Sequence, residues 1–370
     1  MAQGKRDGVL IAGGGLAGSL AAIAMVKMRP EVPILLVEEG DTFGGGRTSV
    51  FFESDIDEAD RWLIEPIATH SWEGYYVAFP GNSRKIKAPC FAVRGADLDR
   101  LIRETLRPDQ YRLGTKAVAV RDNELVLLGG ERVKADGAID ARGAANLSML
   151  ELGWHKYFGR EYSFSAPHRV DRPVLMDATV DQSDGYRFVR CTPFSETRML
   201  VEDCYHSHAP ELDGTLSAER LDQYLAMRGW KGGTVEREAS GILPLAIGGD
   251  FSSFWRVGGA RVARIGLRGG FFQPTTGSTL PDAVRNATVL TEQRDFAGEA
   301  LHDLFEAEAH ALWRRRELQR SFNATLLEAR PEDRRAVFEN VYRLDAPLIG
   351  RFHAGRTGVL DRVRLGKLVR

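Results

Sequence analysis

The stretch of sequence that decides the fold is Gly8-Val9-Leu10-Ile11-Ala12-Gly13-Gly14-Gly15-Leu16-Ala17-Gly18. Residues 8–12 form a short apolar run that predicts a buried strand. Gly13, Gly15 and Gly18 then make the pattern G-x-G-x-x-G, and residues 20–28 predict a helix that no proline interrupts. Glycine is required at such a turn because a Cβ would hold the backbone away from a pyrophosphate group bound at the start of the helix.

A second apolar run, residues 33–37, ends in Glu38, twenty residues after Gly18. An acid at this position accepts hydrogen bonds from the ribose of a bound adenosine. Strand, helix, second strand and acid therefore predict a Rossmann-like dinucleotide-binding domain. No lysine or arginine immediately follows Glu38, so a 2'-phosphate has no evident partner and NADP is disfavoured at this site.

A glycine cluster follows the second strand. Gly44, Gly45, Gly46 and Arg47 are typical of the glycine-rich turn of FAD proteins, and an ordinary turn is the alternative. We therefore predict FAD as the cofactor, with contacts from Gly44, Gly45 and Arg47. Residues 137–143 predict the strand and tight turn by which the chain returns to the cofactor sheet.

The amino-acid composition limits the classes of protein to which the chain can belong. The chain has 370 residues, 43% of them hydrophobic and 27% charged, with a net charge of -1, which is ordinary for a soluble two-domain protein and gives no reason to expect nucleic-acid binding. Cys90, Cys191 and Cys204 form no CxxC pair, so no metal site is predicted. The early apolar run, residues 16–26, is too short for a membrane span, and we predict a cytoplasmic protein.

The predicted fold class is α/β. We expect residues 1–150 and 241–300 to form a discontinuous FAD-binding domain, residues 151–240 a β-rich substrate domain, and residues 301–370 a helical C-terminal region in which Pro331 separates two helical stretches.

Two adjacent acids end an apolar run at Arg198-Met199-Leu200-Val201-Glu202-Asp203. Desolvation disfavours the charged form of a carboxyl group and makes a proton donor, and a second acid alongside acts in the same direction. Glu202 and Asp203 are therefore the predicted catalytic acids. The alternative is that both are solvated or capping residues, as most acids at strand ends are.

Several sequence blocks together resemble the bacterial lycopene β-cyclase family over residues 8–370. They are Met176-Asp177-Ala178-Thr179-Val180-Asp181-Gln182, Gly185-Tyr186-Arg187-Phe188, Leu200-Val201-Glu202-Asp203, Gly266-Leu267-Arg268-Gly269-Gly270, Pro274-Thr275-Thr276-Gly277 and Leu280-Pro281. The resemblance implies an FAD-containing fold related to aromatic hydroxylases, acting on lycopene or a related linear carotene.

The resemblance also implies residue roles. Glu202 matches the essential acid of the family and Asp203 its acidic neighbour. Residues Pro274, Thr275, Thr276 and Gly277 match a segment beside the flavin ring, where a helix N-terminus would favour an anionic reduced flavin. The chain departs from many relatives at Arg47-Thr48-Ser49, where they have His-Thr-Trp, and at Gln273, where they have His.

The implied reaction needs an acid but no net redox change. Protonation of the terminal double bond of lycopene gives a tertiary carbocation, the internal double bond closes a six-membered ring, and proton loss leaves a β-ionone ring, giving β-carotene by way of γ-carotene. A reduced flavin would stabilise the cationic transition state electrostatically, and NAD(P)H would serve as its reductant. The alternatives are an FAD-dependent monooxygenase of the aromatic hydroxylase type and a non-catalytic isoprenoid-binding protein on the same fold.

Three further features have two interpretations each. His206 and His208 alternate along a strand and could bind a metal, although no third ligand is evident. Trp62, Trp72, Tyr75 and Tyr76 could line a polyene tunnel or belong to a general core. Residues 351–370 carry six lysines or arginines among apolar residues, which predicts either a solvated helix face or peripheral association with an anionic membrane surface.

Overall fold

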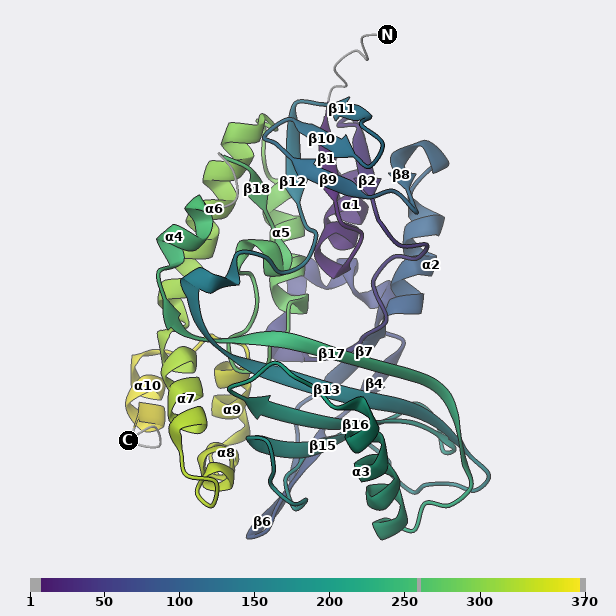
Figure 1. Cartoon of the computed structure of the whole chain (residues 1–370), viewed down its shortest axis with the longest axis vertical. Helices are drawn as coiled ribbons and strands as arrows, with labels where there is room; N and C mark the ends of the chain where they lie inside the picture. Colours follow the sequence, from purple (N-terminus) through teal and green to yellow (C-terminus); the bar gives the residue numbers. More distant parts are fainter. Residues whose placement is uncertain (1–7, 258–260, 367–370) are drawn as a thin grey trace.

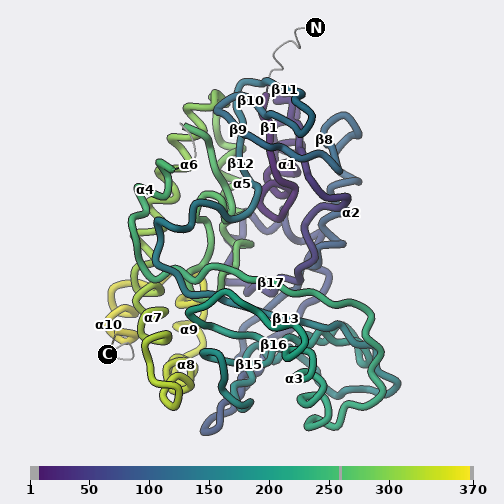
Figure 2. Tube along the Cα trace, viewed as in Figure 1, coloured from purple at the N-terminus to yellow at the C-terminus, as the bar shows by residue number. Residues whose placement is uncertain are grey.

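A computed structural model describes residues 8–257 and 261–366 of the chain. The molecule has two regions, each built on its own main sheet (Figure 1). A parallel sheet with its helices forms the upper region in that view, and a long, mainly antiparallel sheet with helices on both of its faces forms the lower region. The trace in Figure 2 shows the chain passing between the two regions several times.

The parallel sheet has five strands in the order β18-β12-β1-β2-β8. Their bounds are β1 Val9–Ala12, β2 Ile34–Val37, β8 Tyr111–Arg112, β12 Gly137–Asp140 and β18 Ala263–Arg264. Every residue of β1, β2 and β12 is buried, as expected for parallel strands covered on both faces. Helix α1, Leu16–Met28, starts directly after the glycine turn and packs against α5, Leu280–Thr291. The predicted Rossmann-like unit is therefore present.

A small antiparallel sheet, in the order β11-β10-β9, joins the returning strand β12 to the rest of this region. Its strands are β9 Ala117–Val120, β10 Glu124–Leu127 and β11 Arg132–Lys134. Helix α2, Gly95–Thr105, lies on the other side of the parallel sheet (Figure 1).

The long sheet has seven strands in the order β17-β13-β16-β15-β14-β5-β6. Their bounds are β5 Tyr75–Phe79, β6 Asn82–Ile86, β13 Leu150–Phe164, β14 Val174–Asp177, β15 Tyr186–Pro193, β16 Arg198–Ser207 and β17 Gly233–Gly249. One face packs against α3, Gly214–Met227. The opposite face packs against C-terminal helices, so side chains that alternate along one strand enter two different environments.

The strand pairing crosses the predicted domain boundaries in two places. Strands β5 and β6 come from the first 150 residues but pair into the long sheet, and β17 runs through residue 241. A three-stranded sheet in the order β3-β7-β4 also lies within residues 1–150; its strands are β3 Thr48–Phe52, β4 His70–Trp72 and β7 Cys90–Arg94. The division into domains stays a prediction.

Helices complete the chain after β17. They are α4 Phe251–Arg256, α6 Gly298–Arg315, α7 Glu317–Glu328, α8 Arg334–Tyr342, α9 Ala346–His353 and α10 Val359–Gly366. The helical C-terminal region, with Pro331 between α7 and α8, agrees with the sequence prediction. Within the described ranges, no helix has the length and apolar character needed to cross a membrane.

Candidate active site

The first part of the site is a cavity of about 600 Å³ at the carboxyl ends of β1, β2 and β12. Gly13, Gly15 and Glu38 line it together. Glu38 follows β2 directly, and its carboxylate accepts hydrogen bonds from the backbone N–H of Gly14 at 2.6 Å and of Gly40 at 2.8 Å. The sequence prediction for these residues thus coincides with a real cavity at the edge where nucleotides bind in such sheets.

The glycines of this cavity have two different roles. A Cβ on Gly18 would lie 2.0 Å from the carbonyl oxygen of Gly13, so Gly18 allows α1 to pack closely on the turn. A Cβ on Gly15 would meet no protein atom within 4 Å. Gly15 therefore borders open space at the N-terminus of α1, and these residues fit the pyrophosphate of FAD.

A second cavity, of about 520 Å³, continues from the glycine-rich turn. Gly44 and Gly45 adopt φ angles of +77° and +66°, which glycine tolerates, and the N–H of Gly44 donates to the carbonyl of Gly14 at 2.8 Å. A Cβ on Gly95 would lie 1.8 Å from the carbonyl oxygen of Gly45, so the turn packs directly on the start of α2. Gly44, Gly277 and Arg47 line this cavity, which fits the flavin half of FAD.

The segment of Pro274, Thr275, Thr276 and Gly277 differs from its prediction. It forms a turn before α5, which begins only at Leu280. The Oε1 atom of Gln273 accepts from the backbone N–H groups of Thr275 at 2.6 Å and Thr276 at 2.8 Å. The expected helix N-terminus is therefore not at these residues, since the glutamine side chain already occupies their N–H groups. Thr279, the residue before α5, lines the flavin cavity instead.

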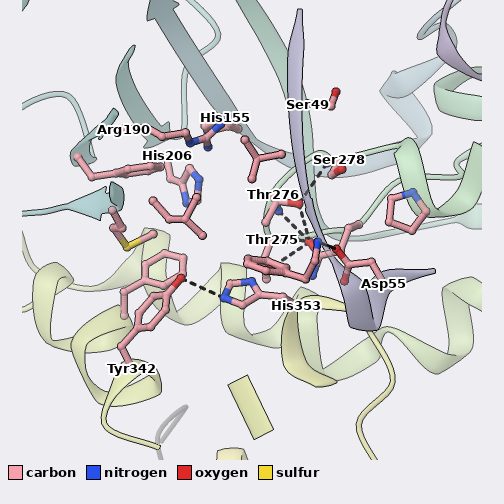
Figure 3. Close-up of a pocket in the computed structure, with 18 of the residues that line it drawn as sticks. Ser49, Asp55, His155, Arg190, His206, Thr275, Thr276, Ser278, Tyr342 and His353 are labelled. Carbon is pink, nitrogen blue, oxygen red and sulfur yellow. Dashed lines mark hydrogen bonds between the residues drawn. The ribbon is translucent and has the colours of Figure 1, made fainter. Parts of the chain in front are cut away.

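The third cavity, of about 860 Å³ and partly open to solvent, adjoins the second because Arg47 and Ser49 line both. Its walls come from β3, the long sheet, the segment after Gln273 and the C-terminal helices, and Figure 3 shows its labelled side chains. Aromatic and apolar side chains include Phe52, Met176, Phe188, Phe338 and Tyr342. Trp62, Trp72, Tyr75 and Tyr76 are not among its lining residues.

Glu202 lies on β16 behind Arg190, which lines this cavity, and Glu202 itself is not among the lining residues. The two residues are cross-strand partners, and Arg190 Nη1 lies 3.5 Å from Glu202 Oε2. On the other neighbouring strand the partner is Gly159, where a Cβ would lie 2.8 Å from Glu202 Cγ, so the glycine leaves room for the acid. Arg47 is within electrostatic reach of Glu202, and burial lowers the pKa of Arg47. Glu202 is thus a buried acid with two cations nearby.

Asp203 points to the opposite face of the sheet, which corrects the expectation of two acids acting side by side. Successive residues of a strand alternate between faces, and Asp203 faces α3. It accepts from Arg187 Nε at 2.7 Å and from the hydroxyl of Tyr205, which in turn accepts from Arg220 at 2.7 Å. Burial raises the pKa of Asp203 against the effect of Arg187.

Three histidines enter the third cavity. Desolvation lowers the pKa of His206 to about 3 and of His353 to about 4, and it lowers the pKa of His155 well below its usual range. The rings of His155 and His206 stand edge to face with centroids 5.0 Å apart, and Tyr342 shares a hydrogen bond of 3.1 Å with His353 Nε2. These imidazoles are therefore neutral near pH 7.

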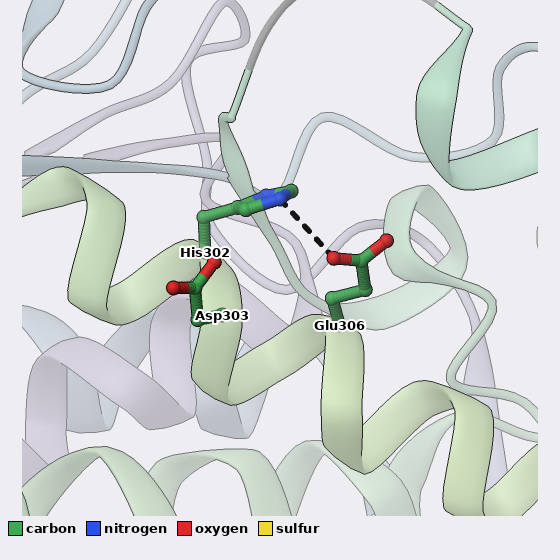
Figure 4. A group of neighbouring side chains, drawn as sticks. All are labelled: His302, Asp303 and Glu306. Carbon is green, nitrogen blue, oxygen red and sulfur yellow. Dashed lines mark ion pairs between the residues drawn. The ribbon is translucent and has the colours of Figure 1, made fainter. Parts of the chain in front are cut away.

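His206 and His208 do not come together as a metal site. His206 faces the cavity, whereas His208 lies beyond the end of β16 with its Nε2 3.1 Å from the carbonyl of Leu327. Among the described residues, one other group brings possible ligand atoms together, His302, Asp303 and Glu306 on α6 (Figure 4). Arg261 already binds both carboxylate oxygens of Asp303 at 2.9 Å, and the absence of a metal stays a prediction.

Comparison with known proteins identifies the family. The chain matches the family model described as "Lycopene cyclase protein" over residues 8–369. It belongs to the lycopene cyclase family. It is 34% identical to a lycopene beta-cyclase of Pantoea ananas over 358 residues, which cover 96% of this chain and 93% of the relative. It is 35% identical to a lycopene beta-cyclase of Paracoccus sp. (strain N81106 / MBIC 01143) over 362 residues, covering 96% and 92%.

Solved structures confirm the fold class. A geranylgeranyl bacteriochlorophyll reductase-like protein of Thermoplasma acidophilum superposes with a TM-score of 0.70 at 14% identity, covering 98% of this chain and 99% of that one. The p-nitrophenol 4-monooxygenase of Pseudomonas putida gives 0.64 at 17% identity, covering 99% of each chain. A flavin-dependent brominase gives 0.65 at 16% identity, covering 95% and 94%. The chain of this cyclase family member therefore has the α/β fold of flavin-dependent aromatic hydroxylase-like oxidoreductases.

Sequence reasoning missed several residues of the site. Arg190 could have been found, because a strand pattern precedes the acid pair and a cation opposite an acid is a common cross-strand pairing. Arg142 lines the adenosine cavity next to the returning strand β12, but nothing in its local sequence marks it. Asp55, Tyr342 and His353 come together only through the tertiary structure.

Proposed function

We propose that this chain is a lycopene β-cyclase that closes β-ionone rings at the linear ends of lycopene by acid catalysis, with reduced FAD bound and without net redox change. The observation that carries the proposal is the position of Glu202. It is a buried carboxyl group whose cross-strand partner Arg190 lines a cavity with aromatic and apolar side chains, and this cavity shares Arg47 and Ser49 with the flavin cavity. Neither hydroxylation nor simple carriage of an isoprenoid needs such an acid.

Glu202 is the proposed proton donor to the terminal double bond. Donation leaves a carboxylate, and Arg190, at 3.5 Å, stabilises that negative charge. The aromatic faces of Phe188, Phe338 and Tyr342 offer negative π density to the carbocation that forms. His155 and His206 are neutral, and this also favours the carbocation, because charged imidazolium rings in this wall would repel it.

FAD is proposed to lie across the first two cavities. Gly13 and Gly15 would admit the pyrophosphate, and Gly18 would let α1 pack closely on the turn. Glu38 would accept the ribose hydroxyls, and Gly44 and Gly45 would leave room for the flavin chain. The reduced flavin would supply a fixed negative charge beside the cationic end of the carotene. Residues 274–277 form the turn between the flavin and substrate cavities, with Thr275 and Thr276 lining the latter and Gly277 the former.

Arg47 is the proposed link between cofactor and acid. Its guanidinium lies 5.1 Å from the ring of Tyr157, it lines both cavities, and its Nε has no hydrogen-bond partner within the described part of the chain. A buried cation in this place can pair with a reduced, anionic flavin. NAD(P)H is the proposed reductant of that flavin.

The function is tested with the purified holoprotein and lycopene in liposomes, under strict anaerobiosis. We expect cyclised products of the same mass as lycopene when the flavin is reduced, with no NAD(P)H consumed beyond the initial reduction. Products that gain oxygen, with stoichiometric NAD(P)H and oxygen consumption, would show the monooxygenase instead. Bound but unchanged lycopene would show the carrier, and turnover by the fully oxidised enzyme would contradict the role of the reduced flavin.

We also propose peripheral association with the membrane through α10. Val359, Leu360 and Val363 are 78%, 81% and 58% exposed on this helix, whereas Leu365 of the same helix is buried. The arginines nearby are largely neutralised: Arg351 pairs with Asp361 at 2.7 Å, Arg356 with Asp57 at 2.8 Å and Arg364 with Asp345 at 2.8 Å. Residues 367–370 of the predicted basic end lie outside the described residues. The apolar side chains are therefore the main support for membrane binding.

Replacing Val359, Leu360 and Val363 by serine should lower the partition of the protein into liposomes by about tenfold or more, since each buried apolar side chain contributes roughly 1.5–3 kcal/mol at full burial. FAD content should not change. A matched control replaces Val118, on β9, and Leu128, directly after β10, by serine. Both are exposed, and the small sheet of β9 and β10 lies at the opposite end of the molecule (Figure 1). Equal partition of both variants in a liposome flotation assay would exclude α10 as the contact.

A further inference from the structure

Asp55 is the single carboxyl group among the described residues that line the substrate cavity. It lies at the end of a short 3-10 helix, Glu53–Asp55, directly after β3. Its Oδ2 accepts from the backbone N–H of Phe52 at 2.9 Å, whereas its Oδ1 is buried and has no hydrogen-bond partner within the described ranges. In Figure 3 it lies across the cavity from His155, His206 and Arg190, with the turn of Thr275 and Thr276 between them.

Burial raises the pKa of Asp55 to about 7. The charged groups that face it are already paired elsewhere. Arg356, on the segment after α9, binds Asp57, and Arg316, after α6, binds Asp282 of α5 at 2.6 Å. His353 of α9 is neutral near pH 7. Among the described residues, no cation forms an ion pair with the Asp55 carboxylate, which makes Asp55 a comparatively strong base in this cavity.

Two buried carboxyl groups lie in different environments, one behind Arg190 in the sheet wall of the cavity and one in the wall opposite. Glu202, on the sheet, has Arg190 beside it, which stabilises the carboxylate that remains after proton donation. Asp55, on the other wall, has an unpartnered oxygen and gains by accepting a proton. Among the described residues, Asp55 is therefore the carboxyl group that combines a place in the cavity wall with an oxygen able to take up a proton.

We propose that Asp55 is the catalytic base that removes the ring proton in the last step of cyclisation. This inference rests on the proposed cyclase function. Glu202 gives its proton to the terminal alkene carbon, and the internal double bond then forms the ring bond and leaves the positive charge on a ring carbon. The adjacent C–H bond breaks, its electron pair forms the ring double bond, and the proton goes to Asp55 Oδ1. One proton enters and one leaves, so atoms and electrons balance.

The histidines of the cavity are weaker candidates for this step. His206 and His353 have pKa values of about 3 and 4, against about 7 for Asp55. A difference of three or more pKa units corresponds to roughly a thousandfold weaker proton affinity, so Asp55 is the strongest base of this group.

The test compares Asp55→Asn with the matched control Glu58→Gln, an exposed acid three residues away in the same segment. Wild-type kcat should rise with pH through about 7, because a base must be deprotonated to act. Asp55→Asn should lose this rise, lower kcat by about a hundredfold, and shift residual product toward rings with the double bond in a neighbouring position. Glu58→Gln should keep the wild-type profile and product.

Folding is monitored separately by the melting temperature. Because the folded state raises the pKa of Asp55, its burial destabilises the protein increasingly as pH rises from about 4 to 7. Asp55→Asn should therefore melt no lower than wild type at pH 8. An Asp55→Asn enzyme that keeps the pH rise and the wild-type product would overturn the role of Asp55. Absence of any cyclised product from the wild-type enzyme would instead contradict the cyclase function itself.

Discussion

Glu202→Gln is expected to abolish cyclisation while folding and FAD binding stay intact. The amide keeps the shape of the side chain beside Gly159 but cannot donate a proton to an alkene. General acid catalysis typically contributes about a hundredfold to ten-thousandfold, and protonation of an unactivated alkene belongs at the upper end of that range. Turnover of lycopene per bound flavin measures the effect, with the flavin absorbance spectrum as the check on the cofactor site.

Asp203→Asn is the comparison variant, because its residue is the neighbour of Glu202 in sequence but faces α3. Removing its charge leaves the buried guanidinium of Arg187 without a counter-ion, and breaking such a pair typically costs about 3–5 kcal/mol of stability. We therefore expect a lower melting temperature and a loss of turnover per folded molecule of less than about tenfold. A Glu202→Gln enzyme that retains more than about a tenth of the wild-type rate would place the acid elsewhere.

The second large effect is expected from Gly15→Val on the binding of FAD. A Cβ at this position meets no protein atom within 4 Å, and the φ of -67° suits any residue, so the fold should tolerate the change. The added side chain would instead occupy the open space at the N-terminus of α1, where the pyrophosphate is expected. The Kd for FAD should rise by about a hundredfold or more, equivalent to roughly 3 kcal/mol.

Titration of the apoprotein with FAD, followed by flavin fluorescence, measures this effect. Gly366→Val is the matched control. A Cβ added at Gly366 would also meet no atom within 4 Å, and Gly366 lies on α10, outside all three cavities. The melting temperature of the Gly15→Val apoprotein should match that of the wild type. An FAD affinity within about threefold of the wild type would show that the cofactor does not lie against Gly15.

Local sequence was sufficient for the cofactor half of the fold. Residues 8–38 hold a strand, a glycine turn, a helix, a second strand and an acid, and the structure has each of them in that order. These elements neighbour one another along the chain, so short-range hydrophobic patterning and backbone conformation decide their arrangement. The C-terminal helices were predictable for the same reason.

The turn at residues 274–277 could not be predicted from the family resemblance alone. The four residues were expected at a helix N-terminus, but the side chain of Gln273 accepts the N–H groups of Thr275 and Thr276 and forms a separate turn. Sequence spacing alone does not reveal a side-chain acceptor that competes with the helix for backbone donors.

The sequence by itself determined that the chain has a Rossmann-like unit and that Glu202 lies on a strand. Only the tertiary structure decided that Asp203 faces away from Glu202, that Arg190 and Arg47 lie near the acid, and that Asp55 lines the same cavity as these two arginines. The physical reason is that strand pairing and packing bring these groups together from distant parts of the chain. Their burial and charge surroundings, which set their protonation, exist only once those parts are packed.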